Sequence, residues 1–250
     1  MSYPTNQHRH ESRLGMLMMV YLKKITRGVL RKFGIIVIKD EFYNYLISPS
    51  VMELLDRYKI VIHSVLHIGG HLAEEASLYR KKGIQKVIFI EGDPETFQEM
   101  LSALERYPGY SGIGAMLSNE NSISEFFVAS NEGASSSILE PGRHLIQRPD
   151  IEFNIIKRIE TVTLDSLGLD VYDLVVLDVQ GAELKVIQGG METIKHAKAI
   201  WVEVNAGSMY KGDASSSDII SILAEHFVPL YMNMGEDKWG DALLISKSLI

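Results

Sequence analysis

The sequence predicts an α/β fold: a mostly parallel sheet of seven strands, covered by helices and ending in an antiparallel strand. From residue 64 onward, short apolar runs alternate with amphipathic helical patterns, which is typical of βαβ units. The runs are almost continuously apolar, as expected for strands that are covered on both faces. The last two runs follow each other without room for a crossover helix, so we expect them to pair antiparallel.

The elements follow in chain order. The expected parallel strands cover residues 64–68, 86–90, 110–117, 173–178 and 199–204. The helices between and after them are expected over residues 71–82, 94–107, 182–195 and 215–226. The antiparallel pair is expected over residues 228–234 and 241–246.

The alternation is interrupted between residues 118 and 163. Strands are expected there at 124–129 and 155–163, on either side of a polar loop around 131–137. A long irregular connection in a compact domain is usually functional or mobile. The whole order of elements is the sheet pattern of Rossmann-like class I methyltransferases and differs from that of dehydrogenases.

Residues 1–60 are expected to form an N-terminal helical extension, and residues 61–250 the Rossmann-like domain. Over residues 14–29 the apolar side chains fall on one helical face and the basic side chains on the opposite one. This pattern predicts an amphipathic helix. A second helix is expected over 51–58, because Pro49 and Ser50 precede it in the way that is typical of a helix start.

The composition excludes several classes of protein. The chain contains no cysteine, which excludes a disulfide scaffold, thiolate zinc sites and a cysteine nucleophile. No apolar run reaches the ~18–20 residues that cross a bilayer. We therefore expect a soluble, cytoplasmic protein without a transmembrane segment.

Charge is distributed unevenly along the chain. Residues 1–40 contain eight Lys and Arg against Glu11 and Asp40, whereas the other 210 residues contain 17 basic and 30 acidic side chains. Such an acidic body is a poor general binder of nucleic acid, because neutralised phosphates supply most of that affinity. No nucleic-acid partner is therefore expected. The basic face of the N-terminal helix is expected to dock on the acidic body of the same subunit or of another subunit, and in the second case the protein is a homo-oligomer. The alternatives are that this face holds an anionic substrate or lies on an anionic membrane surface.

Motifs at the ends of the first two expected strands are typical of a nucleoside cofactor site. Residues 67–71 read HIGGH, so a strand runs into Gly69 and Gly70, and a helix is expected to open at about His71. Glycines at this turn let the backbone approach a ligand at the carboxyl end of the strand. Glu91 ends the next strand, where an acidic side chain can accept both ribose hydroxyls. NAD and S-adenosylmethionine share that ribose, so this motif does not separate them.

A third motif follows the fourth expected strand. Residues 174–183 read LVVLDVQGAE, so an apolar strand delivers Asp178 to the carboxyl edge of the sheet. Gly181 then allows a sharp turn into the next helix. Asp178 is interpreted as a functional side chain; the alternative is that it caps that helix.

These motifs resemble the FkbM methyltransferase family, whose patterns are D-x-G-A-N-x-G, an acidic residue with Pro, T-L-D-x-L, and K-x-D-x-[EQ]-G-A-E. The corresponding stretches here are residues 67–73, 90–94, 163–167 and 177–183. The resemblance takes in residues 64–205, more than half of the chain. The first pattern departs from the family, because His67, His71 and Ala73 stand where Asp, Asn and Gly are usual.

The resemblance implies S-adenosylmethionine as the cofactor and O-methylation of a small metabolite, polyketide or sugar. It implies that Gly69 and Gly70 line the methionine end, Glu91 the ribose and Ser118 the adenine. The residues expected to contact the cofactor are His67, Gly69, Gly70, His71, Glu75, Glu91, Gly92, Asp93, Ser118, Asp178 and Gln180. A base must take the hydroxyl proton, and the candidate catalytic residues are Asp178, His71 and Glu203.

Two polar loops containing glycine are expected over the carboxyl edge of the sheet, where they would shape a substrate pocket. The candidate substrate contacts are Ser135, Ser136, Ser137, Asn205 and Tyr210. Asp178, Glu203 and Asn205 all end strands and carry oxygen donors of the kind that hold Mg²⁺. Ordinary hydrogen bonds would satisfy the same groups, so we expect no metal and keep Mg²⁺ as the alternative.

Two other functions stay open at this point. An NAD-linked Rossmann oxidoreductase is opposed by the missing third glycine of G-x-G-x-x-G and by the antiparallel end of the sheet. A non-catalytic binding module with an S-adenosylmethionine-type fold is the other alternative, because a fold does not fix a function.

Overall fold

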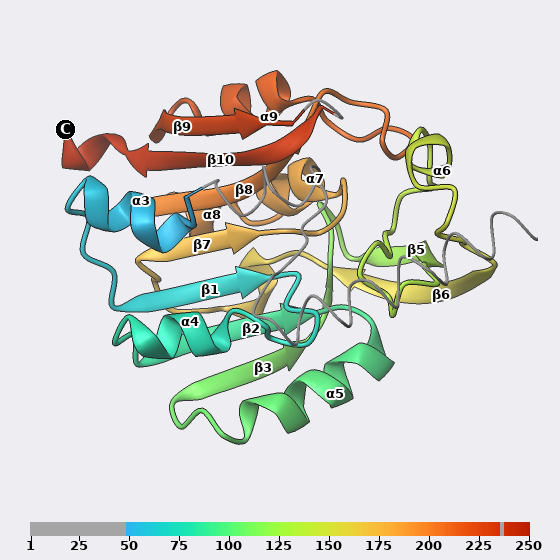
Figure 1. Cartoon of the computed structure of the whole chain (residues 1–250), viewed down its shortest axis with the longest axis horizontal. Helices are drawn as coiled ribbons and strands as arrows, with labels where there is room; N and C mark the ends of the chain where they lie inside the picture. The colour runs from blue at the N-terminus through green and yellow to red at the C-terminus, as the bar shows by residue number, and fades with distance from the viewer. Residues whose placement is uncertain (1–48, 236–237) are drawn as a thin grey trace, which may run out of the picture. The chain divides into compact units, whose positions relative to one another are not determined.

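The computed structural model describes residues 49–235 and 238–250 (Figure 1). The expected amphipathic helix over 14–29 and its docking lie outside the described residues. Helix α3 (Val51–Arg57) belongs to the unit formed by Pro49–Ile250. The expected division of the chain at residue 60 stays a prediction.

A sheet of seven strands runs in the order β3-β2-β1-β7-β8-β10-β9 (Figure 1). Its strands are β1 (Ser64–Ile68), β2 (Lys86–Glu91), β3 (Tyr110–Gly114), β7 (Leu174–Leu177), β8 (Ala199–Asn205), β9 (Phe227–Met234) and β10 (Trp239–Ser246). β10 pairs antiparallel with β8 and with β9, and the remaining neighbours pair parallel. This confirms the predicted α/β class and the antiparallel last strand.

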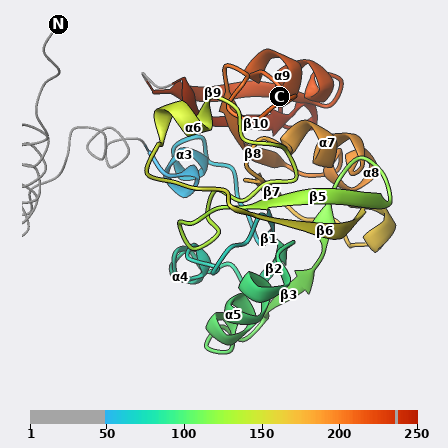
Figure 2. The same cartoon turned by 90° about the vertical axis from the view of Figure 1, so that its right-hand side faces the viewer.

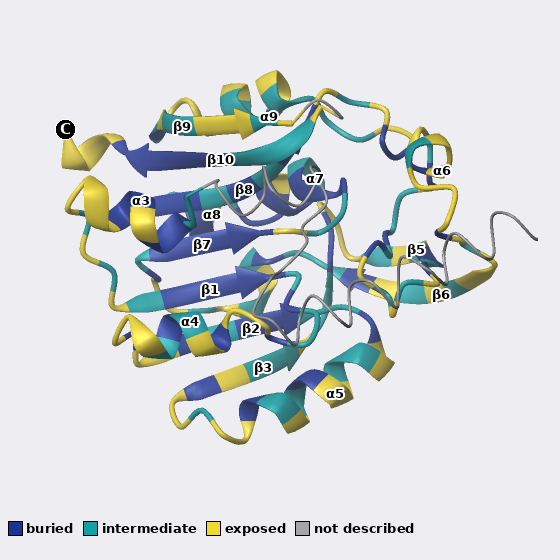
Figure 3. Cartoon of the chain, viewed as in Figure 1, coloured by how far each residue is buried: buried dark blue, intermediate teal, exposed yellow. Residues whose placement is uncertain are grey.

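Helices cover both faces of this sheet. One face carries α3, α4 (Ala76–Lys81) and α5 (Pro94–Leu104), and the other carries α7 (Glu183–Gln188), α8 (Met191–Ile194) and α9 (Ser216–Leu223). Successive strand residues point to opposite faces. Val65 therefore packs in the core under α3, α4 and α5, whereas Leu66 and Ile68 pack in the core under α7, α8 and α9. Figure 3 shows the central strands as mainly buried and the helices with one buried side.

Two of these helices begin with reciprocal caps. The Ser50 side chain accepts the N–H of Glu53, whose side chain accepts the N–H of Ser50, and Ser215 and Asp218 repeat the arrangement at α9. Such a box satisfies two N–H groups that the first helical turn leaves without intrahelical partners. The prediction of a helix after Ser50 is confirmed.

Two helix predictions were wrong in detail. α4 begins at Ala76 and not at about His71, because His71 and Ala73 have φ values of 40° and 57° and form a turn. The helix expected over 182–195 is divided into α7 and α8 at Gly189. A Cβ at Gly189 would lie 2.2 Å from the carbonyl oxygen of Ser118, so the helix breaks where another segment comes close.

A second, smaller sheet follows the main one. The strand expected over 110–117 is divided into β3 and β4 (Met116–Leu117), and β4 leaves the main sheet to pair with β6 (Ile155–Val162). β6 also pairs antiparallel with β5 (Ser122–Val128). Figures 1 and 2 show β5 and β6 beyond the carboxyl ends of β1 and β7. The short elements α6 (His144–Gln147), η1 (Asp165–Leu167) and η2 (Lys247–Leu249) complete the described fold.

Candidate active site

The turn after β1 brings the ends of β1, β2 and β7 into contact. The N–H groups of Gly69 and Gly70 donate to the carbonyl of Ile90 at 3.0 and 2.9 Å. Gly69 has a φ of +84°, and a Cβ there would lie 1.6 Å from the carbonyl oxygen of Asp178. Only glycine allows this approach. The two amides therefore serve the turn itself, and the missing side chain of Gly69 lets β1 and β7 end side by side.

Glu91 connects the loops that follow β1 and β2. Its Oε2 accepts the N–H of His71 at 2.9 Å, and its Oε1 accepts the N–H of Asp93 at 2.8 Å. Burial raises the pKa of the Glu91 carboxyl, while these amides oppose the rise. The side chain is partly exposed. Because each carboxylate oxygen has a second lone pair, Glu91 can still accept two hydroxyl donors.

Gly92 and Asp93 pack against neighbouring segments. A Cβ at Gly92 would lie 2.6 Å from the sulfur atom of Met116. The buried Asp93 carboxylate accepts the Thr96 hydroxyl and pairs with the Lys157 ammonium, both at 3.0 Å. Lys157 belongs to β6, so this ion pair ties the small sheet to the start of α5.

His67 and Ser118, both expected to contact the cofactor, are buried and have partners inside the protein. His67 Nδ1 lies 2.9 Å from the Tyr79 hydroxyl, and its ring stacks on Phe89. Burial lowers the pKa of His67 to about 4, so this imidazole is neutral at pH 7. The Ser118 hydroxyl donates to Asn119 at 3.2 Å.

His71 links the glycine turn to the loop over residues 131–137. Its Nδ1 lies 2.8 Å from Oε1 of Glu74, and its Nε2 lies 3.0 Å from the carbonyl oxygen of Glu132. The hydrogen bond to Glu74 makes the largest contribution in raising the pKa of His71 to about 9. His71 is therefore protonated at neutral pH and donates both bonds. The neighbouring Glu75 is exposed.

The bonds that protonated His71 donates to Glu74 and to the carbonyl of Glu132 form a charged bridge. This bridge should make the free energy of unfolding depend on pH. The pKa of His71 rises from 6.5 to about 9 on folding, so its contribution is complete below pH 6.5 and is lost as pH rises through 9. We expect the difference in unfolding free energy between wild type and His71→Ala to shrink over that range. Urea denaturation at a series of pH values measures it. The exposed His196 provides the control His196→Ala; a difference for His71→Ala that is constant with pH would contradict the bridge.

Asp178 follows β7 and is exposed at the carboxyl edge. Gln180 Nε2 donates to Oδ1 of Asp178 at 2.7 Å and lies 3.4 Å from Oε2 of Glu203, which belongs to β8. The surrounding protein partly desolvates the Asp178 carboxyl and raises its pKa, while the bond from Gln180 opposes the rise. The structure thus brings three of the expected residues together.

Two further carboxyl groups, which the sequence analysis did not assign to the site, lie at the same edge. Glu183 is buried, and its Oε1 accepts the N–H groups of Val179 and Gly181, both at 3.1 Å. Asp241 lies opposite Glu203 in the pairing of β10 with β8. The signal for Asp241 is the direction of β10: an antiparallel strand begins where its parallel neighbours end.

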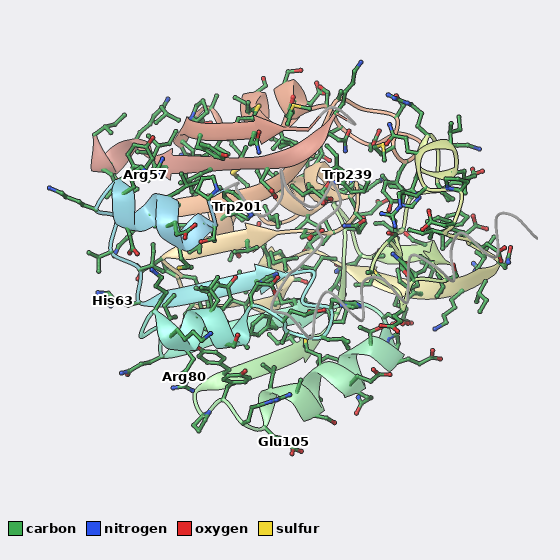
Figure 4. The ribbon with its side chains drawn as sticks, viewed as in Figure 1. Arg57, His63, Arg80, Glu105, Trp201 and Trp239 are labelled. Atoms are coloured by element: carbon green, nitrogen blue, oxygen red, sulfur yellow. The ribbon has the colours of Figure 1, made fainter. Side chains whose placement is uncertain are left out.

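These carboxyl groups interact. Burial, followed by other effects that include the charge of Asp178, raises the pKa values of Glu183 and Asp241 to about 7. Burial, and then the charges of Asp178, Glu183 and Asp241, raises the pKa of Glu203 well above its ordinary value. Trp239, labelled in Figure 4, stands at the start of β10 and forms a hydrogen bond with Glu203. At neutral pH, therefore, not all of the carboxyl groups at this edge are ionised.

Serines fold the loop over 131–137 and attach it to the motif after β7. The Oγ of Ser135 accepts the side-chain amide of Asn131, and the Oγ of Ser136 accepts the backbone N–H of Ala129, both at 3.0 Å. The Ser137 hydroxyl donates to the backbone carbonyl of Gln180 at 2.7 Å. The candidate substrate serines thus all have partners within the protein.

Tyr210 and Asn205 are buried as well. The Tyr210 hydroxyl lies 2.9 Å from the carbonyl oxygen of Ser135 and 3.2 Å from Oε1 of Gln180. Asn205 Oδ1 accepts the N–H of Gly207 at 2.5 Å. Across the described part of the chain, no three His, Cys, Asp or Glu side chains are grouped so that they could hold a metal ion.

Residues 67–227 match the methyltransferase FkbM domain. Over 217 residues the chain is 30% identical to the 2-O-methyltransferase NoeI of Sinorhizobium fredii. This match covers 81% of the present chain and 86% of the relative. Among solved structures it resembles methyltransferase FkbM from Methylobacillus flagellatus (17% identity, TM-score 0.48, covering 76% of this chain and 46% of that one). It also resembles a TehB-like methyltransferase from Corynebacterium glutamicum (11% identity, TM-score 0.43, 83% and 95% covered).

Among the helices that the structure describes, none has the length and apolar character needed to cross a membrane. The domain match begins at His67 and includes the glycine turn, Glu91 and the motif around Asp178. It supports the resemblance seen in these motifs and offers nothing for an NAD-linked oxidoreductase. Because the match covers more than half of the sequence, the chain belongs to the FkbM methyltransferase family.

Proposed function

We propose that this enzyme transfers a methyl group from S-adenosylmethionine to a hydroxyl oxygen of a small metabolite, polyketide or sugar. Membership of the family supports methyl transfer, and the name of the Sinorhizobium fredii relative, a 2-O-methyltransferase, supports oxygen as the acceptor atom. The observation that carries the proposal is the position of Asp178, exposed at the carboxyl edge where ligands bind in open α/β sheets.

The residues after β1 and β2 suit this cofactor. Glu91 would hold the ribose, since its carboxylate keeps an acceptor position on each oxygen after binding two amides. Gly69 and Gly70 would border the methionine end, because they form the turn at the carboxyl end of β1. Ser118 stays the residue that we propose beside the adenine, although its hydroxyl donates to Asn119 and its N–H to Val162. S-adenosylmethionine supplies an electrophilic methyl group when it is bound.

Asp178 is the candidate best suited to accept the hydroxyl proton. Glu183 is buried against backbone amides, and burial together with the neighbouring carboxyl groups raises the pKa of Glu203 well above its ordinary value, which favours its protonated form. His71 is already protonated, because its pKa is about 9. Asp178 is exposed, and its raised pKa moves it toward neutral pH, where a general base works best.

Three further parts of the proposal concern partners and location. The acceptor is a small molecule and not nucleic acid, because the residues after position 40 are strongly acidic. Assembly through the helix expected over 14–29 stays a prediction, as does a cytoplasmic location.

Thermal unfolding of the full chain tests the choice of cofactor. A ligand that binds only the folded state raises the unfolding temperature. We expect S-adenosylmethionine and S-adenosylhomocysteine to raise it and NAD and NADP to leave it unchanged. A shift with NAD alone would favour an oxidoreductase, and no shift with either sulfur compound would contradict the proposal.

Replacing Glu91 should weaken the cofactor site. We expect Glu91→Ala to reduce the affinity for S-adenosylhomocysteine by roughly 1.5–3 kcal/mol, as is typical of hydrogen bonds to a charged group. Titration calorimetry measures this loss. Glu99→Ala, which changes an exposed glutamate of α5, is the control. Because Glu91 also accepts two backbone amides, the unfolding temperature without ligand must be recorded; wild-type affinity in Glu91→Ala would show that another residue holds the ribose.

A further inference from the structure

Gln180 has a backbone conformation that most side chains avoid. Its φ is 54°, in the left-handed region, and it is followed by Gly181 with a φ of 93°. Glycine would adopt this conformation without strain. A strained residue next to a reacting group points to a functional use of its side chain. The contacts of Gln180 indicate what that use is.

The Gln180 amide lies between two carboxyl groups. Its Nε2 donates to Oδ1 of Asp178 at 2.7 Å and lies 3.4 Å from Oε2 of Glu203. A carboxylate only accepts hydrogen bonds, so chemistry assigns the NH₂ group to the side of Asp178. The amide oxygen Oε1 then faces the Tyr210 hydroxyl at 3.2 Å.

Tyr210 is itself held in place. It is fully buried, and its one hydroxyl proton is shared between Oε1 of Gln180 and the carbonyl oxygen of Ser135, which lies 2.9 Å away. A Cβ at Gly181 would lie 2.7 Å from the Tyr210 ring, so the ring packs directly on the turn after Gln180. Ser137 holds the other end of Gln180, because its hydroxyl donates to the Gln180 carbonyl at 2.7 Å. Both the backbone and the amide of Gln180 are thereby fixed.

We propose that Tyr210 and Gln180 are positioning residues: Tyr210 fixes the Gln180 amide, and the amide holds Oδ1 of Asp178 so that Oδ2 is left for the acceptor hydroxyl. The inference rests on the proposed role of Asp178 as the base. It gives Tyr210 an indirect function, since a fully buried side chain acts through the group that its hydroxyl contacts. It also explains why the loop over 131–137, which carries Ser135 and Ser137, is attached to this turn.

The arrangement predicts a measurable effect on Asp178. A donated hydrogen bond favours the ionised carboxylate, so loosening the amide should raise the pH at which Asp178 titrates. The other groups that act on Asp178 or on its carboxyl neighbours are His67, His71, Glu75, Glu183, Glu203 and Asp241. Neither substitution below changes any of them.

The test is a carboxyl titration of the full chain by NMR, with aspartate labelled with carbon-13 and the Asp178 signal assigned by its loss in Asp178→Asn. In Tyr210→Phe we expect the Asp178 midpoint to rise by roughly 0.5–1 pH unit, the effect of losing one modest hydrogen bond. Tyr110→Phe is the matched control, because this buried tyrosine also donates to a backbone carbonyl, at 2.8 Å, but at the start of β3. We expect the control to leave the midpoint unchanged.

A second variant distinguishes a specific effect of Tyr210 and Gln180 on Asp178 from a general loss of structure. Gln180→Met keeps the length of the side chain and removes the amide, so it should raise the midpoint at least as much as Tyr210→Phe. Adding Tyr210→Phe to Gln180→Met should then change nothing more, because the two residues act in series. Unchanged midpoints in both single variants would contradict the proposal that Tyr210 and Gln180 position Asp178. Additive shifts in the double variant would contradict it as well. If Asp178→Asn retains methyl transfer, it is the assignment of the base that fails, whatever the midpoints show.

Discussion

Asp178→Asn should lower methyl transfer at least ~100-fold, within the usual range for loss of a general base. Asparagine keeps the size of the side chain and cannot take the hydroxyl proton. The measurement is transfer of a radiolabelled methyl group from S-adenosylmethionine to a panel of hydroxylated metabolites and sugars. Binding of S-adenosylhomocysteine should persist, because the ribose contact proposed for Glu91 is untouched.

The matched control for this variant is Asp170→Asn. Asp170 is an exposed aspartate just before β7 and pairs with Lys86 at 2.8 Å, so it lies at the opposite end of the same strand. We expect it to retain wild-type activity. Wild-type turnover in Asp178→Asn would remove Asp178 from the mechanism, whereas loss of cofactor binding would show that Asp178 contacts the cofactor instead.

Gly69→Ala should be the most damaging small substitution in the described structure. The new Cβ would lie 1.6 Å from the carbonyl oxygen of Asp178, and the residue would keep a φ of +84°. Overpacking costs about 1–3 kcal/mol or more, and the left-handed conformation adds about 1–2 kcal/mol. The sum is a large part of the roughly 5–15 kcal/mol that stabilises a typical domain. Urea denaturation should therefore show a severe loss of stability, together with loss of cofactor binding.

Gly83→Ala separates the two contributions. Gly83 has a φ of +78°, similar to that of Gly69, but no atom beyond its two chain neighbours lies within 4 Å of the position of its Cβ. It should therefore cost only the conformational term, about 1–2 kcal/mol. Equal losses in the two variants would show that β1 and β7 can separate without cost, and the close contact at the turn would not matter.

The order of the main elements could be predicted because its signals are local. Runs of apolar residues set β1 and β7, and glycines mark the turns after them, so Glu91 and Asp178 were placed at the carboxyl edge from the sequence. The antiparallel β10 followed from the short connection after β9. The same reasoning could have found Asp241, since the direction of β10 brings its first residues to that edge.

The protonation and burial of the site side chains could not be predicted in this way. His71 was a candidate base by its position, but its proton depends on Glu74 and on the carbonyl of Glu132, which is 61 residues away in the chain. His67 was expected to contact the cofactor, yet its ring is buried against Tyr79 and Phe89. A pKa depends on burial and on neighbours in space, and neither can be read from a motif.

The sequence by itself therefore determined the α/β class, the order of the strands along the chain, and the family to which the glycine turn, Glu91 and the Asp178 motif belong. Only the tertiary structure decided where α4 begins, which serines bind within the protein, and that Tyr210 meets Gln180 from 30 residues away. Periodicity and turn residues act within a few positions along the chain. Burial, charge and hydrogen-bond partners at the carboxyl edge depend instead on segments that only folding brings together.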